Sequence, residues 1–393
     1  MNKIYLDNAA TTPLSSEVLN EMMPYLTGDF GNPNSLHSFG RTAKSAIELA
    51  RERIARAIGC EPSEVYFTSG ATESNNWALN GIAKANRHKG NHIITSKIEH
   101  PSILETCKKL EREGFRVTYL DVDEMGLVRI DQLLHYIGAD TILISIMSAN
   151  NEVGTIQNIQ AIANIAKEKN VIFHTDATQA VGAVSFSVRE MGIDAMSISG
   201  HKLNGPKGVG ALYVHDGVVI TPFMNGGEQE SGLRAGTSNV PGIVGLGKAV
   251  EIATRDIMAN SKKVRELRDY FIKKVVELIP MTQLNGHPVQ RLPNNINLSF
   301  GMVEGESLMY LLDLNGIAVS TGSACSSGSV ENSHVLSAMG IAPDLAQGAV
   351  RFSLGRNTTK QDIEYVIEKL VECVEKLRKI SAMSKSQVGK EDE

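Results

Sequence analysis

Between about residues 60 and 220, short apolar runs alternate with stretches of helical periodicity, and this alternation limits the possible folds more than any other feature. We expect strands near 64–67, 92–95, 116–120, 141–145, 171–174, 194–198 and 209–213, and helices near 72–86, 101–113, 129–136, 158–168 and 178–182. The pattern is typical of an α/β fold with a mostly parallel central sheet covered by helices on both faces. Such sheets bind ligands beyond the carboxyl ends of their strands.

Both ends of the chain depart from this alternation. A helical region precedes it, within 16–59. After about residue 258 we expect helices and strands near 261–278, 295–300, 305–314, 317–320 and 360–379. We therefore predict a large domain over 16–258 and a smaller α+β domain over 259–380. Residues 1–15 are expected to join the smaller domain. The polar residues 381–393 are expected to be disordered.

The composition is that of an ordinary globular protein. Of the 393 residues, 42% are hydrophobic and 21% are charged, with a net charge of −5, so charge gives no sign of a nucleic-acid partner. No apolar run reaches the length of a membrane span, and the N-terminus has no signal-peptide core. The four cysteines form no CxxC pair, which argues against a disulfide scaffold or a zinc site. We expect a cytoplasmic protein that needs no metal, membrane or direct nucleic-acid contact.

Lys202 follows an apolar, strand-like run and precedes a glycine-rich turn. A lysine at a strand end can lie inside a cleft, where burial and nearby positive charge lower its pKa and favour covalent binding of an aldehyde. Ser199 and His201 flank it and can donate hydrogen bonds to a phosphate. An ordinary loop lysine fits the same short motif.

Two other strand ends carry polar groups. Asp176 ends an apolar run, where it can either pair with a pyridinium nitrogen or cap the next helix; Gln179, three residues later, can donate to the phenolic oxygen of such a ring. In the segment 68–76, small residues lead into a helix, so its N-terminus can bind an anion, with Thr72 adding a hydroxyl. Simple capping by Ser69 or Thr72 remains an alternative there.

Cys325 lies in a segment of small Ser and Gly residues, which favours a mobile surface loop over 321–333 and an exposed, reactive thiol. Cys60, Cys107 and Cys373 lie in or beside helical patterns and are expected to be structural. Arg351, in a later strand-like run, is suited either to hold a carboxylate or to form a surface salt bridge.

Several of these segments together resemble the NifS/IscS-type cysteine desulfurases, which have the class V aminotransferase fold (fold type I of the pyridoxal-phosphate enzymes). The resemblance covers nearly the whole chain, from Tyr5 to about residue 375. It is carried by Gly70-Ala71-Thr72-Glu73-Ser74-Asn75, Glu99-His100-Pro101, Asn150-Asn151-Glu152-Val153-Gly154, the Asp176 and Lys202 segments, Arg234-Ala235-Gly236-Thr237, and Gly322-Ser323-Ala324-Cys325.

The resemblance implies that pyridoxal 5'-phosphate is the cofactor. Lys202 would bind it covalently and move protons, His100 would stack on the ring and serve as acid or base, and Cys325 would be the third catalytic residue. The implied cofactor-binding residues are Lys202, Ala71, Thr72, His100, Asn151, Asp176, Gln179, Ser199, His201 and Thr237. Apart from the resemblance, His100 before Pro101 is typical of a helix start, and Asn151 of a turn.

The resemblance also implies partners. Thr237 would reach the phosphate of the neighbouring subunit, which makes the active unit a homodimer, and Asn151 and Arg351 would hold the carboxylate of L-cysteine. The products would be L-alanine and a persulfide on Cys325, which passes sulfur to an acceptor protein in iron–sulfur cluster assembly, thio-cofactor synthesis or tRNA thiolation.

The C-terminal residues 378–393 differ from the family's scaffold-docking tail, so a different acceptor, such as one on a tRNA-thiolation route, is our hypothesis. A selenocysteine lyase, an aminotransferase and an inactive interaction partner remain alternatives.

Overall fold

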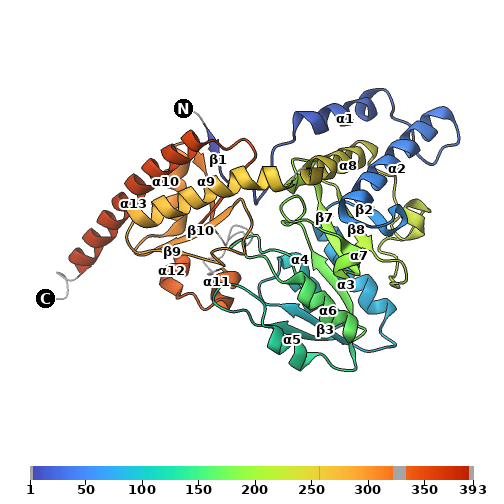
Figure 1. Cartoon of the computed structure of the whole chain (residues 1–393), viewed down its shortest axis with the longest axis horizontal. Coiled ribbons are helices and arrows are strands. Elements are labelled where there is room, and N and C mark those ends of the chain that lie inside the picture. Colours follow the sequence, from blue (N-terminus) through green and yellow to red (C-terminus); the bar gives the residue numbers. More distant parts are fainter. Residues whose placement is uncertain (1–2, 256, 322–332, 389–393) are drawn as a thin grey trace.

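The computed structural model describes residues 3–255, 257–321 and 333–388 (Figure 1). Its large sheet has seven strands in the order β2-β8-β7-β6-β5-β3-β4. These strands are β2 (Val65–Thr68), β3 (His92–Ser96), β4 (Arg116–Leu120), β5 (Thr141–Ser145), β6 (Ile172–Asp176), β7 (Ala195–Ser199) and β8 (Gly210–Val214). β8 is antiparallel to both of its neighbours and the other pairs are parallel, which confirms the predicted α/β fold with a mostly parallel sheet.

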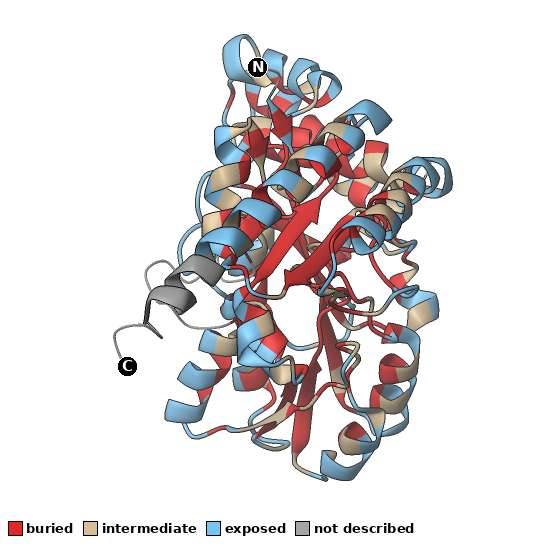
Figure 2. Ribbon diagram, turned by 90° about the vertical axis from the view of Figure 1, so that its left-hand side faces the viewer, coloured by how far each residue is buried: buried red, intermediate tan, exposed pale blue. Residues whose placement is uncertain are grey.

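Helices cover both faces of this sheet. On one face, α3 (Ala71–Ala85) and α4 (Pro101–Arg112) pack through a core that contains Trp77 and Leu110. On the other face, α2 (Ser38–Ile58), α6 (Ile159–Glu168) and α8 (Val240–Arg255) share a second core. Figure 2 shows buried strands between helices whose outer sides are exposed. α2 is amphipathic, with Ala43, Ile47 and Ile54 buried, and it ends at Gly59 in the left-handed conformation.

The helix predicted over 178–182 is wrong. Asp176 Oδ1 accepts a hydrogen bond of 2.9 Å from the Thr178 amide, which makes a turn, and Gly182 adopts a φ of +78°. Asp176 therefore caps no helix, and the next helix is the short α7 (Val188–Met191). The long helix α8 was not predicted, although most of its apolar residues are buried.

The C-terminal part has its own sheet and core. The sheet order is β12-β13-β10-β9, and β1 (Ile4–Tyr5) pairs with β11 (Ile317–Ala318) beside it. The sheet strands are β9 (Thr282–Leu284), β10 (Asn295–Phe300), β12 (Ser320–Thr321) and β13 (Ala349–Ser353). Ile4 and Leu6 share this core with α9 (Ile257–Leu278), α10 (Gly305–Leu314) and α13 (Lys360–Val388). This shared core supports the domain boundaries at 15 and 258, which stay predictions.

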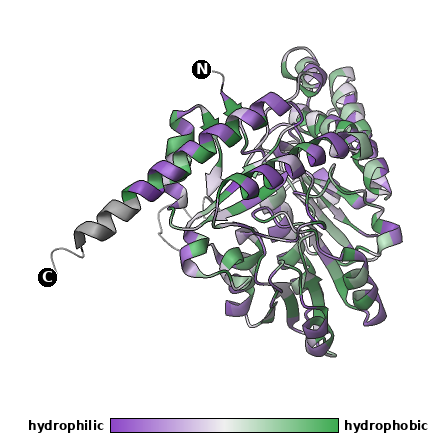
Figure 3. Cartoon of the chain, turned by 60° about the vertical axis from the view of Figure 1, so that its left-hand side comes forward, coloured by the Kyte–Doolittle hydropathy of each residue, from purple (hydrophilic) through white to green (hydrophobic). Residues whose placement is uncertain are grey.

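The remaining helices are α1 (Ser16–Thr27), α5 (Ile130–Tyr136), α11 (His334–Ala338) and α12 (Pro343–Gln347). The backbone of α13 continues to Val388 and projects away from the body (Figures 1 and 3), and residues 389–393 lie outside the described residues. The expected disorder over 381–393 stays a prediction. No helix in the described part of the chain is long and apolar enough to cross a membrane.

Candidate functional site

Lys202 lies just beyond β7, in the short 3-10 turn Gly200–Lys202. Its Nζ donates hydrogen bonds to the carbonyl oxygens of Ala9 at 2.6 Å and Ala10 at 2.7 Å. Gln179 Nε2 also donates to the Ala9 oxygen, at 3.0 Å. The structure thus brings Lys202 and Gln179 together at one backbone oxygen, at the carboxyl edge of the large sheet.

Asp176, the last residue of β6, is joined to His100 by a chain of hydrogen bonds. Asn75 Nδ2, from α3, donates to Asp176 Oδ2 at 2.7 Å and to Ser102 Oγ at 2.9 Å. Ser102 Oγ lies 2.8 Å from His100 Nδ1. Asp176, Asn75 and Ser102 are all buried. Two helices and a strand therefore fix the carboxylate and the imidazole relative to each other.

His100 has the helix-start role that is typical of its position before Pro101. Its Nδ1 accepts a hydrogen bond of 3.1 Å from the Ser102 amide, so His100 caps α4. Burial lowers the pKa of His100; the nearby Asp176 opposes this effect, and Lys202 adds to it. The ring is therefore neutral near pH 7, and because Nδ1 accepts, the ring hydrogen lies on Nε2.

A candidate anion site, called here the anion cup, is formed by Gly70–Thr72. Gly70 has a φ of 150° and precedes α3 without a side-chain cap, which leaves the first amides of the helix available for an anion. Gly210 pairs with Thr68 on one side and with Ser199 on the other, so the cup and Ser199 lie at adjoining strand ends. A Cβ on Gly210 would lie 2.7 Å from the Gly70 Cα, so the close approach requires glycine.

His201 lies next to Lys202 and is half-buried. Burial and the charges of Lys202 and Lys207 lower its pKa to about 4, so its ring is neutral near pH 7. The ring Nδ1 lies 3.1 Å from Thr11 Oγ1, in the segment that also receives the Lys202 hydrogen bonds.

These groups fit pyridoxal 5'-phosphate. The cup suits its phosphate, the buried carboxylate of Asp176 suits its ring nitrogen, and the amine of Lys202 suits its aldehyde. The Thr178 Oγ1 atom, next to Gln179, is buried and has no hydrogen-bond partner within the described residues, as expected beside a group that supplies one.

Arg351, on β13, contributes from the smaller sheet. It is 4% exposed; Nη2 donates to Asp7 Oδ1 at 2.9 Å, and Nη1 donates to the Asn151 carbonyl at 3.2 Å. Nε is buried and has no partner in the described part of the chain. Arg351 and Asn151 are thus brought together, although the contact is to the Asn151 backbone. The predicted surface salt bridge is a mostly buried one.

Thr237 is exposed in the segment before α8. Neighbouring Arg234 forms a two-point ion pair with Glu73, which follows the anion cup, with distances of 2.8 and 3.2 Å.

The predicted nucleophile Cys325 lies outside the described residues. The first described residue after it, Ser333, donates a hydrogen bond to buried Glu152 at 2.5 Å. Burial raises the pKa of Cys60 to about 12, which agrees with an unreactive thiol.

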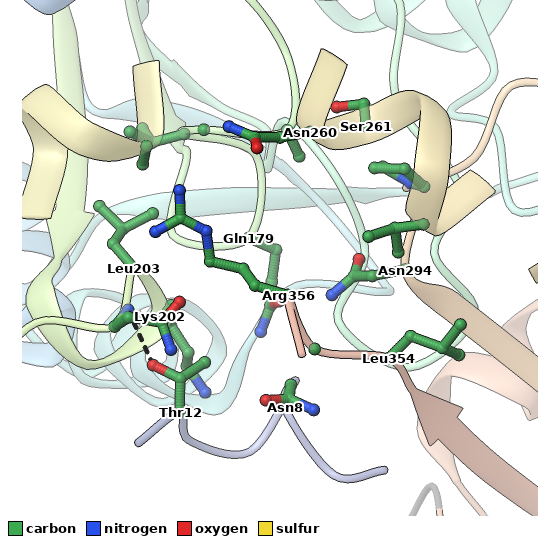
Figure 4. A pocket seen from close by; sticks show the side chains of 18 of the residues that line it. Asn8, Thr12, Gln179, Lys202, Leu203, Asn260, Ser261, Asn294, Leu354 and Arg356 are labelled. Atoms are coloured by element: carbon green, nitrogen blue, oxygen red, sulfur yellow. Dashed lines mark hydrogen bonds between the residues drawn. The ribbon is translucent and has the colours of Figure 1, made fainter. Parts of the chain in front are cut away.

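A pocket of about 130 Å³ opens beside Lys202 and Gln179 (Figure 4). The start of α9, with Asn260 and Ser261, forms one wall, and Arg356 extends across it. His100, Asp176, Arg351 and the anion cup do not line this pocket, which shares only Lys202, Gln179 and Thr178 with the groups described above.

Sequence reasoning gave no role to Asp7, Asn75, Ser102 or Glu99. Asn75, like its neighbour Ser74, is a polar residue on the buried and mostly apolar face of α3, and that position was a usable signal. Asp7 meets Arg351 only through tertiary structure, because 344 residues separate the two.

Comparisons with known proteins agree with this geometry. The aminotransferase class-V family matches residues 4–366. A cysteine desulfurase IscS from Methanosarcina thermophila is 55% identical over 97% of this chain and 94% of its own. Among solved structures, a NifS-like protein superposes with a TM-score of 0.90 at 41% identity, covering 95% of this chain and 100% of that one. A structure titled SspA in complex with cysteine has a TM-score of 0.80 at 39% identity, covering 91% and 100%. The chain therefore belongs to the class-V aminotransferase family, as a pyridoxal-phosphate-dependent cysteine desulfurase.

Proposed function

We propose that this protein converts L-cysteine to L-alanine and leaves the sulfur as a persulfide on Cys325. The observation that carries the proposal is the meeting of Lys202, Asp176 and the anion cup at adjoining strand ends. The buried guanidinium of Arg351 bonds Asp7, in the same N-terminal segment whose Ala9 oxygen accepts from Lys202. The relative solved in complex with cysteine supports the same substrate.

Arg351 would bind the substrate carboxylate. Its guanidinium is held by one carboxylate, that of Asp7, and its Nε has no partner among the described residues. An incoming carboxylate would share or displace Asp7, and burial strengthens that interaction because few waters compete for it.

The cofactor, when bound, supplies an electron sink for the bonds at the substrate α- and β-carbons. The Lys202 amine would take the proton from the α-carbon, and His100 would serve as a second acid or base. The Cys325 thiolate would attack the substrate sulfur. The carbon–sulfur bond would break with its electron pair left on the β-carbon, which would take up a proton. Return of a proton to the α-carbon would then complete alanine.

We further propose a homodimer in which Thr237 binds the phosphate in the neighbouring subunit. Its exposure on the segment tied to Glu73 supports this role. The acceptor would be a protein thiol, on an iron–sulfur, thio-cofactor or tRNA-thiolation route in the cytoplasm. Binding assays with purified scaffold and tRNA-thiolation proteins would distinguish these acceptors.

The test is to measure alanine and sulfide released from L-cysteine with a reductant, using protein that retains the visible absorbance of its cofactor. Equal amounts from the wild type and from a Cys60→Ser control, with none from Cys325→Ser, support the proposal. Alanine that persists in Cys325→Ser would contradict it. The same variant, tested with L-selenocysteine, would then identify a selenocysteine lyase if selenide still forms.

A further inference from the structure

Glu230 forms a buried ion pair that the proposed reaction does not use. Its carboxylate receives two hydrogen bonds from the guanidinium of Arg51, at 2.8 and 3.1 Å. The backbone amide of Phe67, on β2, donates a third at 2.9 Å. The side chains of Arg51 and Glu230 are only 12% and 6% exposed. The Arg51 guanidinium also lies 4.6 Å from the centre of the Phe67 ring.

The backbone at this point is strained. Glu230 has a φ of 45° and Ser231 a φ of 59°, and Gly232 continues the left-handed run with a φ of 75°. Residues other than glycine adopt this region at a cost, and they keep it only where surrounding contacts hold them there. The ion pair with Arg51 and the bond from Phe67 supply those contacts.

The strained turn begins the segment that carries Thr237, called here the Thr237 segment (residues 230–237). Four residues after Glu230, Arg234 forms its ion pair with Glu73, whose Oε2 also accepts a hydrogen bond of 3.0 Å from the Ser69 amide. Beyond these contacts, Thr237 is exposed. The segment is therefore fixed to its own protomer at Glu230 and Arg234 and presents Thr237 outward.

We propose that Glu230 is a positioning residue for the neighbouring active site: it holds the turn from which Thr237 reaches the cofactor phosphate of the partner subunit. This inference rests on the proposed function, because it assumes that Thr237 acts across the dimer. It predicts that loss of the Glu230 carboxylate weakens cofactor binding in the other protomer and leaves the anion cup of its own protomer intact.

The first experiment titrates cofactor-free protein with pyridoxal 5'-phosphate and follows the absorbance of the lysine-bound cofactor. Glu230→Gln and Thr237→Val should each weaken binding about tenfold, because each removes the same phosphate hydrogen bond. The double variant should be no weaker than either single variant. Glu48→Gln is the matched control, because Glu48 also contacts Arg51, at 3.4 Å, but is 49% exposed; its affinity should equal that of the wild type.

The second experiment uses mixed dimers in which Lys202→Ala leaves one protomer unable to bind the cofactor covalently. Only the other protomer then reports binding. Glu230→Gln is placed either on the same protomer as Lys202→Ala or on the reporting protomer, so the two dimers contain the same substitutions. We expect about tenfold weaker binding in the first arrangement and wild-type binding in the second.

The outcomes separate the two levels of the inference. The positioning role is overturned if binding weakens only when Glu230→Gln lies on the reporting protomer. It is also overturned if binding is unchanged in both arrangements. Additive losses in the Glu230→Gln and Thr237→Val double variant overturn it as well. If Thr237→Val does not weaken cofactor binding in the other protomer, the proposed role of Thr237 at the neighbouring subunit's phosphate fails instead. Sedimentation of each variant as a dimer excludes loss of assembly as the cause.

Discussion

The Asp176 side and the Arg351 side of the site are built from different kinds of structure. Asp176 and Ser199 end neighbouring strands of the large sheet, and the anion cup follows a third strand, so strand register sets their positions. Arg351 instead meets an N-terminal residue, Asp7, and a turn residue, Asn151. A site fixed by a sheet suits a group that stays bound. A guanidinium held by one exchangeable carboxylate suits a substrate that comes and goes.

The comparison predicts that a substitution on the Asp176 side lowers kcat. Asp176→Asn removes the charge opposite the ring nitrogen, and kcat for alanine formation should fall about 100- to 1000-fold. Asp194→Asn is the matched control, because this mostly buried carboxyl precedes β7 at the opposite end of the strand. Equal losses in the two variants would mean that burial of a carboxylate, and not its place at the carboxyl edge, matters.

A substitution on the Arg351 side should instead raise KM for L-cysteine. Arg351→Lys loses two-point binding of the carboxylate, so KM for L-cysteine should rise roughly 10- to 100-fold, with cofactor affinity unchanged. Steady-state kinetics and a cofactor titration measure the two quantities. The control is Arg116→Lys, on an exposed ion pair of β4. A fall in kcat at constant KM would remove the distinction between the two sides.

Breaking the hydrogen-bond chain between Asp176 and His100 should lower activity less than substituting Asp176 itself. Asn75→Ala leaves Asp176 Oδ2 without its amide donor, and kcat/KM should fall about tenfold. Asn80→Ala, on the same helix but outside the chain, is the control. Unchanged kinetics for Asn75→Ala, with the loss confined to the free energy of unfolding, would assign the chain to stability alone.

The smallest effect concerns Glu99, which lies beside His100. Burial raises the pKa of Glu99 to about 8, although hydrogen bonds from Ser96 and from the Met147 amide oppose the rise. Because the folded protein holds this proton more tightly than the unfolded chain does, the stability contributed by Glu99 is complete below pH 4.5 and is lost as pH rises to about 8.

Urea unfolding of wild type and Glu99→Gln between pH 5 and 8 measures this loss. The wild type should lose about 1 kcal/mol or more relative to the variant, whose amide does not titrate. Glu105→Gln, at a position that is 64% exposed on the following helix α4, should behave like the wild type. If the free energy of unfolding changed equally with pH in wild type and Glu99→Gln, Glu99 would be ionised throughout this range.

The sequence predicted the Asp176 side well and the Arg351 side poorly, for a physical reason. Strand periodicity locates strand ends, and the ends of parallel strands meet at one edge, so Asp176 and Lys202 could be placed together from local patterns. No local pattern places Asp7 beside Arg351, because the two lie 344 positions apart and meet where Ile4 and Leu6 pack into the smaller core. The wrong helix at 178–182 has a similar origin, since its apolar residues fit a buried turn equally well.

The most direct test of the central claim is mass spectrometry of peptides from protein mixed with L-cysteine and no reductant. The account predicts one added sulfur atom on the peptide that contains Cys325, and none on those with Cys60, Cys107 or Cys373. Alanine formation with no sulfur on the Cys325 peptide, or with the sulfur on another cysteine, would contradict it.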